Sequence, residues 1–148
     1  MARHKGICHS IYATGKLIMG VLHKENCPFC HCVAEKRVVA EYGTVFAILD
    51  KFPVTKGHHL VIPKRHVIDY FEMTPAEKLD AEALLMQLKK QILTDDSTVK
   101  GFNVGMNCGE VAGQTVMHAH IHLIPRRKGD VENPRGGVRG CVPEKMGY

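Results

Sequence analysis

TVMHAHIHLIP, at residues 115–125, carries the strongest structural signal in this chain of 148 residues. Its residues are strongly β-prone, so the segment predicts a strand that ends at Pro125. Side chains two positions apart in a strand share a face and lie about 6 to 7 Å from one another. The histidines are therefore expected on one face, and the apolar residues between them on the other face, against a core. The two sets are His118, His120 and His122, and Ala119, Ile121 and Leu123.

Three interpretations of this row of imidazoles are open. A hydrogen-bonded or solvated histidine face is the first, although each ring has polar nitrogens that need partners. A metal site built from all three is the second, but the outer pair is too far apart to share one ion without further ligands. The third is covalent catalysis, in which a neutral imidazole attacks a phosphorus atom. Residues just upstream favour it, because glycine backbone and polar side chains can approach phosphate oxygens. They are Asn107, Gly109, Gly113, Gln114 and Thr115.

Strand and turn signals continue outside this segment. RVVAEYGTVFAILD, at residues 37–50, predicts a β-hairpin that turns at Glu41-Tyr42-Gly43. HHLVIP, at residues 58–63, and FNVGMN, at residues 102–107, predict two further strands. Mostly antiparallel strands with one long helix and one shorter helix make an α+β domain.

The long helix is expected to begin after Thr74. The hydroxyl of Thr74 can cap the helix, Pro75 suits its first turn, and Glu77 completes a capping box. Apolar residues then recur at helical spacing until the helix ends near residues 94–96. The expected apolar face consists of Leu79, Ala83, Met86 and Leu93, widened by Leu85, Leu88 and Ile92.

The composition predicts one compact, cytoplasmic domain. A hydrophobic fraction of 45% provides an ordinary core, and the net charge of +5 suits either an anionic substrate or a solvated surface. No dense block of Lys and Arg indicates a nucleic-acid partner, and no apolar run has the length of a membrane span. The six cysteines do not form the framework of a disulfide-rich secreted protein, so we expect a reducing compartment. Residues 1–26 show weak periodicity and are expected to be an N-terminal extension of uncertain structure.

Cys27 and Cys30 form a Cys-x-x-Cys motif within CPFCHC. This spacing suits two thiolates on one tetrahedral zinc ion. A redox pair is a second interpretation, although the β-α context of a thioredoxin-like site does not follow. Two buried free thiols are a third.

Taken together, these motifs resemble the histidine-triad (HIT) family. GQTVMHAHIHLIPR, at residues 113–126, is similar to the family signature, in which a Gly-Gln-Ser/Thr-Val turn precedes alternating histidines. The likeness extends to LD at 49–50, KGHHLVIPKRH at 56–66 and NVGMN at 103–107, and it covers roughly residues 27–148. It implies a HIT-like α+β fold with about five mostly antiparallel strands, one long and one shorter helix, and a homodimer. Ala119 departs from the family, which commonly has a bulky apolar residue there.

The resemblance also implies roles for individual residues. His120 matches the nucleophile that attacks the α-phosphate and forms a nucleotidyl-histidine intermediate, and His122 matches the histidine that contacts the phosphate or leaving group. Asp50 matches the position that binds the ribose hydroxyls, and His58 a histidine that supports the site from behind. The positions that contact phosphate oxygens or the leaving group are Asn107, Gln114 and Thr115.

The expected substrates are purine nucleotides, either dinucleoside polyphosphates or nucleoside phosphoramidates, cleaved without a catalytic cofactor. A nucleotidyl transferase or phosphorylase would use the same residues, and a nucleotide-binding regulatory protein is a further alternative. Some bacterial-type members carry a structural zinc held by a Cys-x-x-Cys and two histidines. The resemblance therefore implies the ligands Cys27, Cys30, His66 and His118, with His31 and Cys32 as substitutes. Residues 126–148 are expected to be an irregular tail that helps to close the pocket. Its candidates for distal phosphates are Arg126, Arg127, Arg135 and Arg139.

Overall fold

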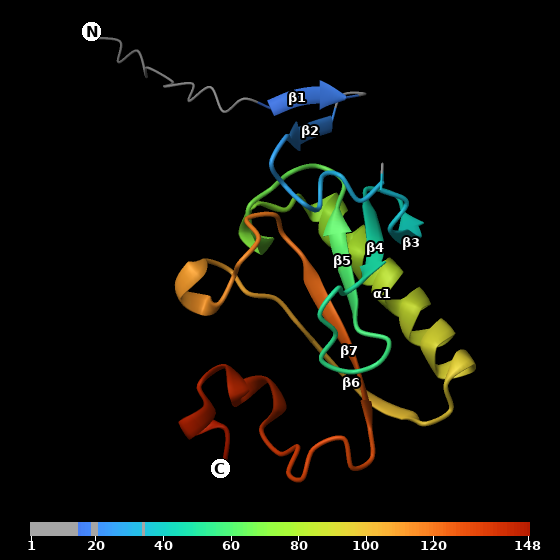
Figure 1. Cartoon of the computed structure of the whole chain (residues 1–148), viewed down its shortest axis with the longest axis vertical. Helices are drawn as coiled ribbons and strands as arrows, with labels where there is room; N and C mark the ends of the chain where they lie inside the picture. The colour runs from blue at the N-terminus through green and yellow to red at the C-terminus, as the bar shows by residue number, and fades with distance from the viewer. Residues whose placement is uncertain (1–14, 19–20, 34) are drawn as a thin grey trace, which may run out of the picture.

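A five-stranded antiparallel sheet with one long helix across one face forms the main body of the computed structural model (Figure 1). The structure describes residues 15–18, 21–33 and 35–148. The strand order is β3-β4-β5-β7-β6, so that β3 and β6 are the sheet edges. The bounds are Val38–Tyr42 for β3, Val45–Leu49 for β4, His59–Pro63 for β5, Val99–Gly105 for β6, Ile121–Arg127 for β7 and Pro75–Asp95 for the helix α1. The predicted α+β class and the hairpin, β3 with β4, are confirmed.

The two faces of the sheet are buried against different parts of the chain. Strand β4 shows this most clearly, because its first four residues are all at most 3% exposed. Val45 packs in the cluster that contains Leu84 of α1, whereas its neighbour Phe46 packs against residues 27–32. The cysteine-rich segment therefore lies on the face opposite α1, and the alternation of strand side chains supplies both cores.

The start of α1 follows the predicted capping box. The side chain of Thr74 accepts a hydrogen bond from the Glu77 N–H, and the carboxylate of Glu77 accepts one from the Thr74 N–H. Burial alone would raise the pKa of Glu77, but the hydrogen bonds from Arg65 and Thr74 bring it below the ordinary value. Through its bond with Arg65, Glu77 thus joins the helix to the segment after β5. The helix ends at Asp95, as expected.

The predicted apolar face of α1 is wrong in part. Leu88 and Ile92 are buried, together with Ala81 and Leu84, but Leu79 and Met86 are 67% and 61% exposed. The buried side is therefore the stripe 81-84-88-92, spaced three or four residues apart. The second apolar side, which includes Leu93, faces outward.

The strand that carries the histidine segment is shifted from its predicted position. Regular pairing in β7 begins at Ile121, so His118 and His120 precede the strand, and β7 continues past Pro125 to Arg127. Ala119 and Leu123 are nevertheless buried in the core beneath α1, as the alternation predicted. Pro125 is tolerated because pairing with β5 stops at Leu123, beyond which the Pro125 carbonyl accepts a hydrogen bond from the Thr55 hydroxyl.

Within the expected N-terminal extension, two short strands form an antiparallel pair, β1 (Gly15–Ile18) with β2 (Val21–Lys24). Residues 1–14 lie outside the described residues, and the boundary near residue 27 stays a prediction. Apart from α1, the helical segments described are short 3-10 turns, and the expected shorter helix is represented only by these. They are η1 (Tyr70–Glu72), η2 (Glu110–Ala112), η3 (Gly137–Cys141) and η4 (Pro143–Lys145). Within the described part, no helix is long and apolar enough to span a membrane.

Candidate active site and metal site

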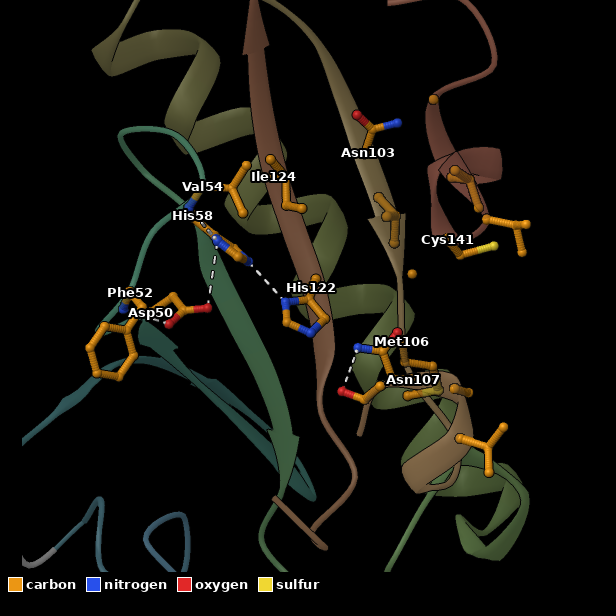
Figure 2. A pocket seen from close by; sticks show the side chains of 18 residues that line it. Asp50, Phe52, Val54, His58, Asn103, Met106, Asn107, His122, Ile124 and Cys141 are labelled. Atoms are coloured by element: carbon orange, nitrogen blue, oxygen red, sulfur yellow. Dashed lines mark hydrogen bonds and ion pairs between the residues drawn. The ribbon is translucent and has the colours of Figure 1, made fainter. Parts of the chain in front are cut away.

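A cavity of about 920 Å³ opens beside the first half of β7. Four of the residues predicted from the sequence line it, and they come from separate elements: Asp50 and His58 flank the β4–β5 loop, Asn107 follows β6, and His122 lies on β7. Figure 2 shows Asp50 and His58 on one side of His122 and Asn107 on the other. The sheet order β5-β7-β6 produces this arrangement, because it places His122 between the other two contributors.

His120 lies beside His122, with the two ring centroids 5.1 Å apart. Nδ1 of His120 is 2.7 Å from the His118 carbonyl oxygen, which can only accept, so Nδ1 carries the proton and Nε2 carries the lone pair. In the described part of the chain, every buried side-chain nitrogen has a hydrogen-bond partner, so Nε2, with none recorded, reaches solvent. Burial lowers the pKa of His120, which is only 7% exposed, against the opposing effects of the His118 carbonyl and Asp50. His120 therefore presents a neutral nitrogen lone pair.

A chain of hydrogen bonds fixes the tautomer of His122. The Val54 N–H donates to Nδ1 of His58 at 3.1 Å, so in neutral His58 the proton is on Nε2. That Nε2–H lies 2.9 Å from Nδ1 of His122, which must accept, and Nε2 of His122 therefore carries the proton. Burial, with the nearby His120 and His58, lowers the pKa of His122 to about 4. Neutral His122 is thus a hydrogen-bond donor, placed on the wall of the cavity.

Asp50 is the carboxylate among the cavity-lining residues. One oxygen accepts from the Phe52 N–H at 2.9 Å, and the other lies 3.5 Å from Nδ1 of His58. Ligand atoms of Asp50, His58 and His122 approach within 4.8 Å of one another, close enough for a metal ion. Both ring nitrogens of His58 already have hydrogen-bond partners, so the network accounts for this cluster without an ion.

The glycine loop before the histidines holds two predicted site residues, Gln114 and Thr115, and neither lines the cavity. Gln114 is 2% exposed and away from the cavity lining. Its amide accepts from the Gly109 N–H and donates to the carbonyls of Ile68 and Val116, so it ties the loop to the body. Thr115 is exposed outside the cavity. Both assignments as substrate contacts stay predictions, and the loop itself contributes its turn η2 to the cavity wall.

Of the cavity residues that were missed from the sequence, two groups are important for the site. Asn103 on β6 is the first, and its place in the NVGMN motif at residues 103–107 was a signal that could have found it, since the whole motif lines the cavity. The second group comes from the C-terminal tail, where no periodic pattern pointed to the site. Its members are Gly137, Val138, Cys141 and Val142.

The four tail arginines are engaged within the protein itself. Arg126 bonds to Asp130 and to the Asn103 side chain, and Arg127 bonds to Asp96. The guanidinium groups of Arg135 and Arg139 lie over the ring of Tyr148.

Cys27, Cys30, His66 and His118 come together from three separate segments. Sγ of Cys27 lies 3.4 Å from Nδ1 of His118, and Sγ of Cys30 lies 3.4 Å from Nδ1 of His66. All four ligand atoms are within 4.8 Å of one another. A tetrahedral zinc ion, with bonds of about 2.3 Å to sulfur and about 2.0 Å to nitrogen, places such atoms about 3.5 Å apart. The cluster can therefore hold a zinc ion.

The hydrogen bonds around this cluster support the same conclusion. Nε2 of His118 lies 2.9 Å from the Pro63 carbonyl and must donate, so Nδ1 directs its lone pair toward the two sulfurs. Burial raises the pKa of Cys30 to about 11, and a cation is needed to favour the thiolate. The two residues expected as substitute zinc ligands have other partners. His31 bonds to the Glu25 carbonyl, and the Cys32 thiol donates to the Pro28 carbonyl.

Comparison with known proteins agrees with the fold, and one similar protein of known structure is Zn-bound. A family model described as the HIT domain matches residues 32–129. "Protein hit" of Bacillus subtilis is 41% identical over 110 residues, which cover 72% of this chain and 75% of that protein. A Zn-bound histidine triad family protein from Mycobacterium smegmatis has a crystal structure that aligns with a TM-score of 0.65 at 34% identity, covering 71% of this chain and 78% of that one.

A relative named for an activity is also similar. The AP-4-A phosphorylase of Mycobacterium tuberculosis is 36% identical over 97 residues, which cover 65% of this chain and 49% of the phosphorylase. The family model spans more than half of the chain, and the five-stranded antiparallel sheet with one main helix is the fold that the resemblance implied. The chain therefore belongs to the HIT family, a superfamily of nucleotide hydrolases and transferases.

Proposed function

We propose that the chain hydrolyses nucleotides at the α-phosphate through a covalent nucleotidyl group on His120. The observation that carries this proposal is the hydrogen bond from Nδ1 of His120 to the His118 carbonyl, because it leaves the Nε2 lone pair available for attack. The hydrogen bonds described above give each neutral ring one tautomer, with a lone pair on Nε2 of His120 and a proton on Nε2 of His122. We therefore assign the nucleophile to His120 and the hydrogen-bond donor to His122.

In the first step, the Nε2 lone pair forms a bond to the α-phosphorus, and the bond from phosphorus to the bridging oxygen breaks. The leaving phosphate departs as an anion, and the Nε2–H of His122 stabilises the charge that develops on it. The attacking imidazole becomes an imidazolium, and its Nδ1–H remains bonded to the His118 carbonyl. Water then attacks phosphorus and releases one proton to the solvent, the P–N bond breaks, and its electron pair restores neutral His120.

The other cavity residues suit the rest of a nucleotide. A carboxylate such as Asp50 can accept hydrogen bonds from two vicinal ribose hydroxyls, and Asn107 offers amide donors to phosphate oxygens. Purine nucleotides are the proposed class, as dinucleoside polyphosphates or phosphoramidates. The similarity to an AP-4-A phosphorylase supports a second candidate, in which inorganic phosphate replaces water as the acceptor.

The acceptor is tested by product analysis in ¹⁸O-labelled water with and without inorganic phosphate. With a diadenosine polyphosphate as substrate, hydrolysis at the α-phosphorus gives AMP that carries the label. Phosphorolysis gives ADP without label when phosphate is present, which would support the second candidate. Label found only on the other product would place the attack at a different phosphorus and contradict the proposed mechanism.

We also propose a structural zinc ion held by Cys27, Cys30, His66 and His118, supported by the ligand distances and by the Zn-bound relative. When bound, the ion would fix the segment 27–32 against the residues that lead into β7. The ion takes no part in the chemical steps above.

A homodimer is proposed on the outward apolar side of α1. Met86 and Leu93 share a groove with Val104 of the edge strand β6, and all three are at least 40% exposed. An edge strand also presents unpaired backbone groups that a second copy can pair with. A second copy would therefore bury both the outer face of α1 and the outer edge of β6.

Val104→Arg is expected to convert the dimer to a monomer, because it places a charge in the proposed interface. Sedimentation at micromolar concentration should show twice the mass of one chain for the wild type and one chain for the variant. Val39→Arg is the matched control, since Val39 lies on the opposite edge strand β3 and is similarly exposed, at 51% against 46%. A wild-type monomer, or dissociation by both variants, would contradict this interface.

A further inference from the structure

One wall of the active-site cavity comes from the C-terminal segment, through Gly137, Val138, Cys141 and Val142. Val138 and Val142 line the cavity and are 67% and 50% exposed there, and Cys141 lies with them. Figure 2 shows Cys141 across the cavity from Asp50, with His122 between them. The proposed ribose-binding carboxylate and this C-terminal segment therefore lie on opposite sides of the catalytic histidine.

The C-terminal end of the chain holds this wall in place. The Tyr148 ring lies under two guanidinium groups, with its centroid 4.7 Å from Arg135 and 5.2 Å from Arg139. Arg139 also donates two hydrogen bonds, of 3.0 and 2.8 Å, to the Lys145 carbonyl. We call residues 134–148 the C-terminal clasp, because these contacts close the segment on itself. Cation–π contacts and charge-assisted hydrogen bonds both stabilise this closed arrangement.

Gly136 allows the clasp to close. Its φ is +89°, a conformation that favours glycine, and a Cβ on it would lie 2.0 Å from the Met146 carbonyl oxygen. Any larger residue at this position would push residues 146–148 away from the start of η3. Val138 and Val142, at the two ends of η3, would then lose their positions on the cavity wall.

The chemistry of the wall indicates what it contacts. Two valines and a thiol face the cavity, while the clasp's own guanidinium groups are turned to Tyr148 and the Lys145 carbonyl. An exposed apolar surface opposite the nucleotide-binding side suits a flat, apolar group, such as a nucleobase, better than further phosphate or a small amine. This favours a leaving group that carries a second nucleoside.

We propose that the C-terminal clasp binds the leaving nucleoside of a dinucleoside polyphosphate, with Tyr148 as a positioning residue. The inference rests on the proposed hydrolase activity, and it selects dinucleoside polyphosphates over nucleoside phosphoramidates. It assigns the discrimination between these substrates to the clasp, and the chemical step to His120 and His122.

The test compares two substrates that give the same AMP but differ in leaving group, diadenosine tetraphosphate and adenosine phosphoramidate. In Gly136→Ala and Tyr148→Ala, kcat/KM for the tetraphosphate is expected to fall about tenfold, mainly through KM, as for the loss of an apolar subsite contact. The value for the phosphoramidate is expected to change less than about twofold, because its leaving group does not reach the clasp.

Gly129→Ala is the matched control, since Gly129 also has a positive φ, of +81°, but an added Cβ there meets no atom within 4 Å. An equal loss for both substrates in the clasp variants would show a merely structural role and overturn the inference. Unchanged kinetics in both clasp variants would overturn it as well. If the wild type releases AMP from neither substrate, the proposed function fails, and the inference fails with it. That outcome is distinct from the failure of the inference alone, in which the enzyme cleaves both substrates and the clasp variants affect them equally.

Discussion

Replacement of His120 by alanine is expected to lower AMP release from a diadenosine polyphosphate by roughly a thousandfold or more. The Nε2 lone pair of His120 is the nucleophile in the proposed mechanism, and alanine provides none. His122 cannot take over, because its Nδ1 accepts a hydrogen bond from His58 and its Nε2 carries the proton. The measurement is initial-rate product analysis by chromatography, with wild type and variant at equal concentration.

His59→Ala is the matched control for this substitution. His59, on β5, is a partly buried histidine whose Nδ1 is bonded to the Gly57 carbonyl, and it takes no part in the contacts of His122 with His58 and His120. Its removal should leave the rate within a few-fold of wild type. Acid-quenched wild type should also carry a nucleotidyl group on His120, detected by mass spectrometry. Persistent AMP release in His120→Ala would overturn the covalent mechanism.

Features encoded by neighbouring residues could be predicted from the sequence. The capping box of Thr74 and Glu77 acts across three residues, and the β3–β4 hairpin turns within three. The alternation that buries Ala119 and Leu123 follows from strand geometry and needs no knowledge of their partners. The same pattern grouped His120 with His122, whose rings lie side by side, but it did not separate them from His118, whose ring lies in the Cys/His cluster.

Features that depend on distant partners could not be predicted from the sequence. Helix α1 is apolar on two sides, and periodicity alone does not say that Leu84 faces the sheet while Met86 faces outward. The cavity wall formed by Val138 depends on contacts between Gly136 and Met146, which lie in a segment rich in Gly, Pro and charge. Gln114 was assigned to substrate from the resemblance, whereas its amide bonds to three backbone groups that no local pattern reveals.

One residue connects the proposed metal site to the proposed active site. The ring of His118 lies in the Cys/His cluster, and its main-chain carbonyl accepts the Nδ1–H of His120. The ring of Phe29, from the same cysteine-rich segment, lies 5.1 Å from the His120 ring. Loss of the ion should therefore disturb both the stability of this face of the sheet and the orientation of the nucleophile.

Cys27→Ser is accordingly expected to reduce bound zinc from one ion per chain to nearly none. It should also lower the free energy of unfolding by about 4 kcal/mol, the effect of losing a ligand present at a thousandfold its Kd. Metal analysis and denaturant unfolding measure the two effects, and AMP release should fall as well, because His118 loses its anchor. A serine oxygen replaces the thiolate with a far poorer zinc ligand at nearly the same volume, so packing contributes little to the change.

Cys32→Ser separates zinc binding from simple disturbance of the buried cysteine segment. Cys32 is fully buried two residues from Cys30, but its thiol donates to the Pro28 carbonyl and lies outside the four-residue cluster. A serine hydroxyl can make the same hydrogen bond, so this variant should keep one zinc ion and most of its stability. Equal loss of zinc in both variants would instead make Cys32 a ligand. Full zinc content in Cys27→Ser would rule out the proposed set, because a tetrahedral site cannot lose a thiolate and bind the ion unchanged.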